Sequence, residues 1–277
     1  MTKKADKACI LNKLKKLFKF KPTVNVINLE GVIGSVSFKH GLTLSSLNKS
    51  IEEAFSGKNI KTVVLNINSP GGSPVQSELI GKRIVQLSQE KNIPVLAIVE
   101  DIAASGGYWI ACAASEIIAA ENALLGSLGV RFSGFGLHKA IERLGIERRI
   151  HTQGESKALL DPFLPEKPSD IEMILKVQAD IYENFKKQVH NGRKDKLKLD
   201  DKEIFSGAIW SGRQAVEIGL ADKIGDLYSE IKERFGEDIK ITIVNQERSW
   251  LKRKLSLLFD CSAQSLLNDF QSKLELR

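Results

Sequence analysis

Long hydrophobic runs are missing from this chain of 277 residues. The longest uncharged apolar stretches, such as Ile93–Val99 and Tyr108–Ala114, are far shorter than the ~20 residues that a bilayer-spanning helix needs. The lysine-rich start is not followed by a long apolar stretch with a small-residue cleavage site, which a secretion signal would have. We therefore expect neither an integral membrane span nor a cleaved export signal, and we expect a cytoplasmic location.

Cysteine is also scarce, with Cys9, Cys112 and Cys261 as its only occurrences. Their number is odd, they lie far apart, and their spacing fits no metal site. A disulfide framework is therefore not expected, which agrees with a reducing compartment. We expect no metal and no organic cofactor.

Positive charge is confined to one end of the chain. The net charge of +7 is accounted for by residues 1–21, which hold eight lysines and one aspartate, whereas the remainder is balanced. The body of the protein thus lacks the basic field that a nucleic-acid backbone requires, and no nucleic-acid partner is expected.

The N-terminal arm, residues 1–21, has a basic amphipathic pattern. Between its lysines, apolar residues recur at helical spacing: Ile10, Leu11, Leu14, Leu17 and Phe18. A short basic helix over residues 9–20 can lie on an anionic membrane surface, which would make the protein peripheral there. A solvated tail and a helix that docks on a partner subunit are the alternatives.

After this arm, strand-like apolar runs alternate with helical patterns. The alternation predicts an α/β fold with parallel strands and covering helices. Strands are expected over 23–29, 62–67, 93–99, 117–119 and 239–244, near Val130 and over 149–152. Helices are expected over 44–55 (capped by Ser45 or Ser46), 74–89, 105–114, 137–144, 170–189 and 211–218. We predict one domain over residues 22–245 and a C-terminal helical extension over residues 246–277.

The loop Asn68–Ser73 places two adjacent glycines, Gly71 and Gly72, between a strand and a helix. It lacks the Gly-Lys-Ser/Thr end of a phosphate-binding loop. Because no side chain intervenes, its backbone N–H groups can face a ligand, and such donors suit a developing oxyanion. A tight strand-to-helix turn is the plain alternative.

Ser105 lies in a second small-residue loop, Asp101–Tyr108, where a predicted helix begins. At that position the helix dipole and the amide of Gly106 would assist a serine nucleophile and the anion that its attack creates. Serine is also a common helix cap, so the position alone does not establish chemistry.

A serine nucleophile needs a base. The four histidines, His40, His138, His151 and His190, lie in no recognisable triad motif, and Ser105 is not in a Gly-x-Ser-x-Gly elbow. A lysine can do this work if burial lowers its pKa from ~10.4 toward 7–8. Lys157 precedes apolar residues that would desolvate it if they packed around it, although composition does not distinguish it from other lysines.

Together, five segments in this order resemble the short form of signal peptide peptidase A and its relatives. They are Asn68–Gly72, Asp101–Tyr108, Gly126–Val130, Gly154–Pro162 and Ser211–Gly225, and the resemblance spans about residues 23–245. It implies a ClpP/crotonase-like α/β fold and a serine–lysine peptidase, usually assembled as a membrane-associated homo-oligomeric ring.

Position by position, the resemblance implies that Ser105 is the nucleophile and that Lys157, 52 residues later, is the general base. Ser127 would hydrogen-bond the lysine, and the amide of Gly106 with one from Gly71 or Gly72 would hold the oxyanion. The implied reaction is hydrolysis of peptide bonds in signal-peptide remnants or other apolar, membrane-derived peptides.

The sequence also departs from the family pattern. The lysine-rich arm stands where many members have a transmembrane anchor. Trp109, Ser115 and Asp161 stand where tyrosine, aspartate and serine are common. None of these differences removes a proposed catalytic group.

Two other functions fit the same fold. A catalytically inactive, membrane-associated scaffold or peptide-binding module would use Ser105 only as a helix cap. A crotonase-type acyl-CoA enzyme would share the fold and the oxyanion loops, but would rely on glutamates in place of a serine–lysine pair.

Overall fold

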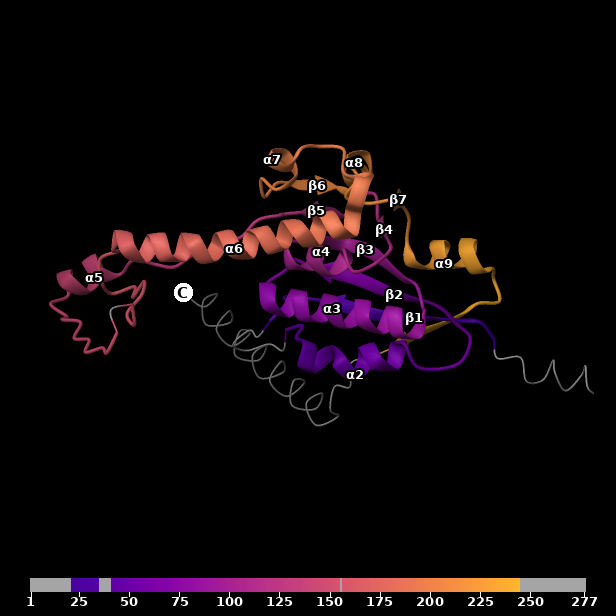
Figure 1. Cartoon of the computed structure of the whole chain (residues 1–277), viewed down its shortest axis with the longest axis horizontal. Helices are drawn as coiled ribbons and strands as arrows, with labels where there is room; N and C mark the ends of the chain where they lie inside the picture. Colours follow the sequence, from indigo (N-terminus) through magenta and orange to yellow (C-terminus); the bar gives the residue numbers. More distant parts are fainter. Residues whose placement is uncertain (1–20, 35–40, 155, 245–277) are drawn as a thin grey trace, which may run out of the picture. The chain divides into compact units, whose positions relative to one another are not determined.

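A mostly parallel β-sheet organises the computed structural model, which describes residues 21–34, 41–154 and 156–244 (Figure 1). The strand order is β6-β5-β3-β2-β1-β8, and β4 pairs with both β3 and β7. Every pair is parallel except β5 with β6. The strands are β1 Thr23–Glu30, β2 Ile60–Ser69, β3 Val95–Ala104, β4 Glu116–Ala119, β5 Leu124–Gly126, β6 Ile209–Ser211, β7 Lys223–Ile224 and β8 Lys240–Val244. The predicted α/β class with parallel strands and covering helices is confirmed.

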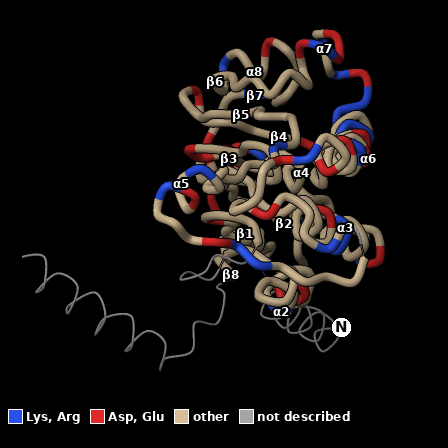
Figure 2. The backbone as a smooth tube through the Cα atoms, turned by 90° about the vertical axis from the view of Figure 1, so that its left-hand side faces the viewer, with Lys and Arg blue, Asp and Glu red and all other residues tan. Residues whose placement is uncertain are grey.

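Helices connect and cover these strands. The helices are α2 Leu44–Ala54, α3 Pro74–Lys91, α4 Gly106–Ala111, α5 His138–Arg143, α6 Pro168–Arg193, α7 Asp201–Ile204, α8 Gly212–Ile218 and α9 Leu227–Phe235, with a 3-10 turn at Lys194–Lys196. Lysine and arginine alternate with aspartate and glutamate along the outer helices (Figure 2).

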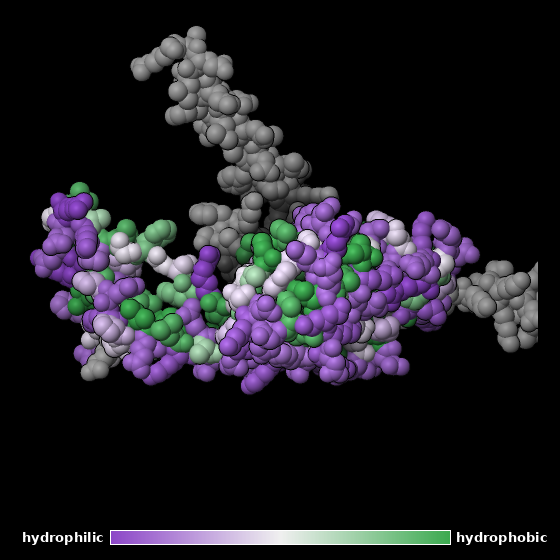
Figure 3. All heavy atoms as spheres, turned by 90° about the horizontal axis from the view of Figure 1, so that it is seen from above, coloured by the Kyte–Doolittle hydropathy of each residue, from purple (hydrophilic) through white to green (hydrophobic). Residues whose placement is uncertain are grey.

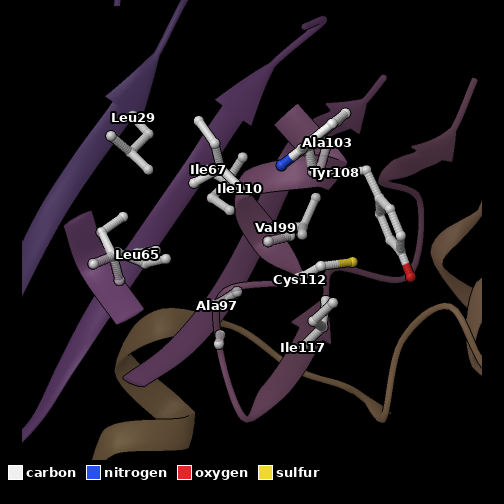
Figure 4. Packing of buried hydrophobic residues seen from close by; sticks show 14 of the residues in the cluster. Leu29, Leu65, Ile67, Ala97, Val99, Ala103, Tyr108, Ile110, Cys112 and Ile117 are labelled. Atoms are coloured by element: carbon white, nitrogen blue, oxygen red, sulfur yellow. The ribbon is translucent and has the colours of Figure 1, made fainter. Parts of the chain in front are cut away.

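The sheet is apolar on both faces. On one face, side chains of β1 to β3 pack with α2, α3, α4 and α6 in the larger core; Figure 4 shows Ile67 beside Ile110 of α4, and Val99 between Ile110 and Cys112, the residue that follows α4. On the other face, a smaller cluster packs β-strand residues against Leu227 and Ile231 of α9. Burial of each large aliphatic side chain contributes roughly 1.5–3 kcal/mol, so this sandwich holds the strand ends in place.

Local sequence signals set several helix ends. Ser73 caps α3, which then begins at Pro74, and Gly219 ends α8 with a φ of 85°. The cap of α2 is Thr43, so the expectation of Ser45 or Ser46 is wrong. Ser46 is instead the third helical residue, and its hydroxyl and backbone amide exchange hydrogen bonds with Thr43 in a capping box.

Two predicted strands are wrong. Neither the segment near Val130 nor residues 149–152 are in a strand. The C-terminal residues of β3, Ile102 to Ala104, pair instead with β5, which ends four residues before Val130. Arg149 is exposed and pairs with Glu147, so its segment has no neighbouring strand to complete a ladder. Short strands such as β5 and β6 gave too few residues for an alternating pattern to be recognised.

Residues 131–167, which we call the projection, continue beyond the N-terminal end of α6 (Figure 1). Its helix α5 has no buried residue. Large apolar side chains are exposed on the projection and on the first turns of α6. They are Phe132, Phe135, Leu137, Leu144, Ile146, Ile171, Met173, Leu175 and Val177. Green, hydrophobic atoms also gather at the left of Figure 3.

The opposite end of α6 is anchored in the core. Arg193, in its last turn, is 1% exposed and reaches Gly219 and Asp222, in the loop that follows α8. The motif Gly219–Gly225 therefore has a structural role at this end of α6.

Several predictions fall on residues outside the described ranges. These are the amphipathic pattern of residues 9–20, the helices of the C-terminal extension 246–277, and the residues His40, Cys9 and Cys261.

Candidate active site

Ser105 lies at the junction between β3 and α4, in an uncommon backbone conformation. Its φ is 50° and its ψ is −117°, outside the regions that a residue with a side chain normally occupies. Its amide donates to Gly126 at 2.8 Å and its carbonyl accepts from Trp109 at 3.0 Å, so both neighbouring elements hold the turn. The Ser105 side chain makes no capping hydrogen bond to α4. The hydroxyl is therefore not used as a helix cap.

The loop after β2 lies against this turn, backbone to backbone. Gly71 and Gly72 have φ values of 96° and 147°, and Ile33 bonds the loop on both sides, through the carbonyl of Gly71 and the amide of Ser73. A Cβ atom added to Gly71 would lie 2.7 Å from the nitrogen of Gly106 and 2.9 Å from the Cβ of Ser105. Glycine is required here because the two loops are in contact.

Two amide groups beside Ser105 are free to bind an anion. A Cβ built on Gly106 would lie 3.3 Å from the nitrogen of Gly72, so the two residues are close neighbours. Neither the Gly72 nor the Gly106 amide donates to a backbone or side-chain acceptor within the described ranges, whereas the Gly71 amide donates to Ser69 Oγ at 3.2 Å. Between the two glycines of this loop, the structure therefore favours Gly72 as the oxyanion donor.

Ser127 faces the same space from the end of β5. Its φ is 52°, and its amide donates to the carbonyl of Ala208 at 2.7 Å. Because β2, β3 and β5 are parallel neighbours, their carboxyl ends bring Gly72, Ser105 and Ser127 to one edge of the sheet.

A cavity of about 680 Å³ joins these residues. Trp109 and Phe185 form part of its wall, with their rings stacked at 4.9 Å. Its lining is mostly apolar or small: Val32, Pro70, Gly71, Gly72, Pro74, Ser105, Gly106, Trp109, Ser127, Gly129, Val130, Arg131, Ile181, Phe185, Ser206 and Gly207. Such a space suits an extended ligand with apolar side chains.

Lys157 is not brought to this cavity within the single chain. It is exposed in the projection, where its amide donates to the carbonyl of Gly154 at 3.2 Å. Three residues later, the amide of Leu160 lies 3.4 Å from the carboxylate of Asp170 in the first turn of α6. At 1.5 Å per residue, Asp170 is about 16 Å along the helix from Ile181, which lines the cavity. The apolar residues after Lys157 do not bury it.

None of the described histidines lines the cavity either, and neither does the described cysteine, Cys112. His138 and His151 lie in the projection, and His190 pairs with Asp201 at 3.1 Å. Burial raises the pKa of the Cys112 thiol to about 12, which excludes a reactive thiolate at neutral pH.

Among the lining residues to which sequence reasoning gave no site role are Arg131, Ile181 and Phe185. Arg131 lies just beyond the Gly126–Val130 motif, which was the one available signal. The other two lie in the middle of a long amphipathic helix, where apolar residues usually indicate core packing.

The described ranges contain no group of three or more metal-ligating side chains that could hold an ion. They also contain no helix that is long and apolar enough to cross a bilayer.

The proteins similar to this chain carry both protease and antiporter names, and one family model matches more than half of the chain. Residues 88–240 match peptidase family S49. The chain is 42% identical over 234 residues to the Na(+)/H(+) antiporter NhaA of Brucella melitensis, covering 84% of this chain and 32% of that protein. It is 32% identical over 209 residues to the chloroplastic serine protease SPPA of Arabidopsis thaliana, covering 72% and 30%. It is 30% identical over 217 residues to protease 4 of Haemophilus influenzae, covering 76% and 34%. The chain thus spans about a third of the length of these relatives.

Proposed function

The chain belongs to peptidase family S49, the family of signal peptide peptidase A, and we propose that it is a serine endopeptidase with Ser105 as its nucleophile and Lys157 as its general base. The observation that carries this proposal is the arrangement around Ser105. An uncapped hydroxyl lies on a strained turn beside two unoccupied amides, those of Gly72 and Gly106.

In the proposed reaction, the Oγ atom of Ser105 attacks the carbonyl carbon of the peptide bond while its proton passes to the neutral amine of Lys157. The amides of Gly72 and Gly106 bind the oxyanion of the tetrahedral intermediate; one such donor contributes about 3–4 kcal/mol to transition-state stabilisation. The proton then passes to the leaving amine, which gives an acyl-enzyme. Water, deprotonated by Lys157, hydrolyses the ester, and Ser127 orients the lysine through a hydrogen bond.

We propose that Lys157 reaches the cavity of a second copy of the chain. Within one copy it is exposed and belongs to the projection, which buries little of its own apolar surface. Exposed apolar side chains grouped in this way are typical of a surface that another protein covers. Burial at such a contact would also favour the neutral amine that the reaction needs. In a homo-oligomeric ring, every copy would have its exposed apolar side chains covered and its Lys157 buried in the cavity of a neighbour.

The proposed substrates are extended apolar peptides, such as signal-peptide remnants and other membrane-derived fragments. Trp109, Ile181 and Phe185 offer an apolar wall beside Ser105, which would accept aliphatic or aromatic side chains. Peripheral attachment to a membrane through residues 9–20 would bring the site close to such peptides.

A mixing experiment tests the proposal. Wild-type protein should be labelled at Ser105 by a fluorophosphonate probe and should cleave a quenched apolar peptide, whereas Ser105→Ala should do neither. Lys157→Ala and Lys157→Arg should be nearly inactive, because a guanidinium does not release its proton at working pH.

Equal amounts of Ser105→Ala and Lys157→Ala, dissociated and reassembled together, should recover about a quarter of wild-type activity, since random assembly pairs an intact serine with an intact lysine in that share of sites. No recovery, with both variants assembled normally, would contradict a lysine from a second copy. Full activity of Lys157→Ala would contradict Lys157 as the general base. Absence of both fluorophosphonate labelling and peptide cleavage in the wild-type protein would favour the scaffold function instead.

A further inference from the structure

Arg131 is the only charged residue that lines the Ser105 cavity within the described ranges. The rest of that lining is apolar, glycine or serine. Arg131 is exposed, and no ion pair or hydrogen bond joins its side chain to another described residue. Most other described arginines are paired, for example Arg193 with Asp222, Arg213 with Glu121 and Arg234 with Glu116, although Arg143 on α5, which does not line the cavity, has no such partner. An unpaired guanidinium in a substrate cavity is therefore unusual in this molecule.

The chemistry of arginine limits what this group can bind. A guanidinium keeps its charge at any working pH, and its planar fork matches a carboxylate through two parallel hydrogen bonds. An unmodified peptide offers a carboxylate in two forms, the side chain of Asp or Glu and the free C-terminus. Arg131 has no competing partner among the described residues. It can therefore bind a substrate carboxylate without breaking an ion pair within the chain.

The position of Arg131 restricts where that carboxylate lies. It is four residues from Ser127, at the start of the projection, and the segment just before it is fixed where Ser127 bonds Ala208 and Gly129 lies beside Gly207. Four residues span at most about 13 Å of chain. A peptide in extended conformation covers that distance with about four residues, so the carboxylate would lie within four residues of the cleaved bond.

We infer that Arg131 is a specificity-determining residue that binds a carboxylate of the peptide substrate, near a scissile bond flanked by apolar residues. This inference rests on the proposed peptidase function of Ser105. On this inference the substrate must carry a carboxylate as well as the apolar side chains that the other walls of the cavity accept.

Matched peptides test this inference. One series places Glu or its neutral isostere Gln at each of the four positions on either side of the scissile bond of a quenched apolar peptide. A second series ends one to four residues after that bond, with a free or an amidated C-terminus. The measured quantity is the ratio of kcat/KM between the charged and the neutral member of each pair. The first series detects an acidic side chain and the second detects a C-terminal carboxylate.

For at least one position, wild-type protein should favour the charged member by about tenfold to hundredfold, the range for hydrogen bonds between charged groups. In Arg131→Gln that ratio should fall to about 1, and Arg131→Lys should keep an intermediate ratio because it retains charge without the fork. Arg131→Glu should reverse the preference when Lys replaces Glu in the peptide. Lys91→Gln, which removes an exposed cation from the end of α3 and away from the cavity, should keep the wild-type ratio.

A wild-type ratio near 1 at every position, or an unchanged ratio in Arg131→Gln, would overturn the inference while leaving the peptidase function intact. Failure to cleave any peptide, together with absence of fluorophosphonate labelling at Ser105, would overturn the peptidase function and the inference with it.

Discussion

Arg193 holds Asp222 in a two-pronged ion pair, with Nη1 2.8 Å from Oδ2 and Nη2 3.1 Å from Oδ1. The guanidinium is buried, and its Nε also donates to the carbonyl of Gly219 at 2.8 Å. The same carboxylate accepts from the amide of Ile117 at 2.7 Å and pairs with Lys196 at 2.6 Å. One aspartate thus connects the end of α6 to β4 and to the loop after α8.

Replacing Asp222 with Asn should destabilise the fold by about 3 kcal/mol, because it leaves the charge of Arg193 buried without a counter-ion. Urea denaturation followed by circular dichroism measures the change in the free energy of unfolding. Glu121→Gln is the matched control: it breaks an ion pair with Arg213 in which both side chains are largely exposed, and should cost less than about 1 kcal/mol. Equal losses in the two variants would contradict a special role for the buried pair.

The contribution of Asp222 should also depend on pH. Burial alone would raise the pKa of its carboxyl group, but hydrogen bonds from Arg193, Ile117 and Lys196 outweigh burial and hold that pKa below its ordinary value. The carboxylate therefore stabilises the fold above the unfolded-state pKa of about 3.9, and this stabilisation is lost as the pH falls through the lower folded-state value. The stability difference between wild type and Asp222→Asn should be largest above about pH 5 and should shrink below about pH 4. A constant difference from pH 7 to pH 3 would show that the charge of Asp222 is not its source.

Gly71→Ala should lower kcat by about a hundredfold or more, the cost of losing one oxyanion donor. The new methyl group would lie within 3 Å of Ala104, Ser105 and Gly106, so the two loops must separate and the Gly72 and Gly106 amides no longer converge. Its left-handed φ of 96° adds backbone strain.

Gly81→Ala provides the control for that substitution. Gly81 lies within α3, and an added Cβ meets nothing closer than 3.9 Å. Activity should therefore persist, and the protein should gain up to about 1 kcal/mol from the better helix former. Unchanged kcat in a folded Gly71→Ala variant would contradict the placement of the oxyanion donors.

Phe135→Ser should reduce both the size of the assembly and its activity, because Phe135 is 84% exposed on the projection and would be buried by a second copy. Light scattering after size-exclusion chromatography measures the assembly, and peptide cleavage measures activity. Tyr228→Ser removes another exposed aromatic side chain, on α9 and away from the projection, and should change neither. If Phe135→Ser assembles as wild type does, another surface must form the contact.

Much of the cavity could be predicted from the sequence because it depends on short-range rules. Ser105 and the Gly71–Gly72 loop each follow an apolar run, and parallel strands bring their carboxyl ends to one edge. Ser127 was expected only from the family resemblance. The place of Lys157 could not be predicted in this way, since it depends on the length and direction of α6. Arg131 was not predicted as a site residue because the sequence indicated a β-strand near Val130. In the structure that segment is not a strand, and it borders the cavity.

The strained turn at Ser105 has an evolutionary consequence. Its backbone angles are ones that glycine adopts at little cost and other residues adopt at a cost of about 1–3 kcal/mol. A lineage that no longer needed the hydroxyl would gain stability by mutation to glycine at this position. A serine that persists at this position in descendant proteins would therefore indicate selection for catalysis. A glycine at the same position would indicate that the catalytic activity had been lost.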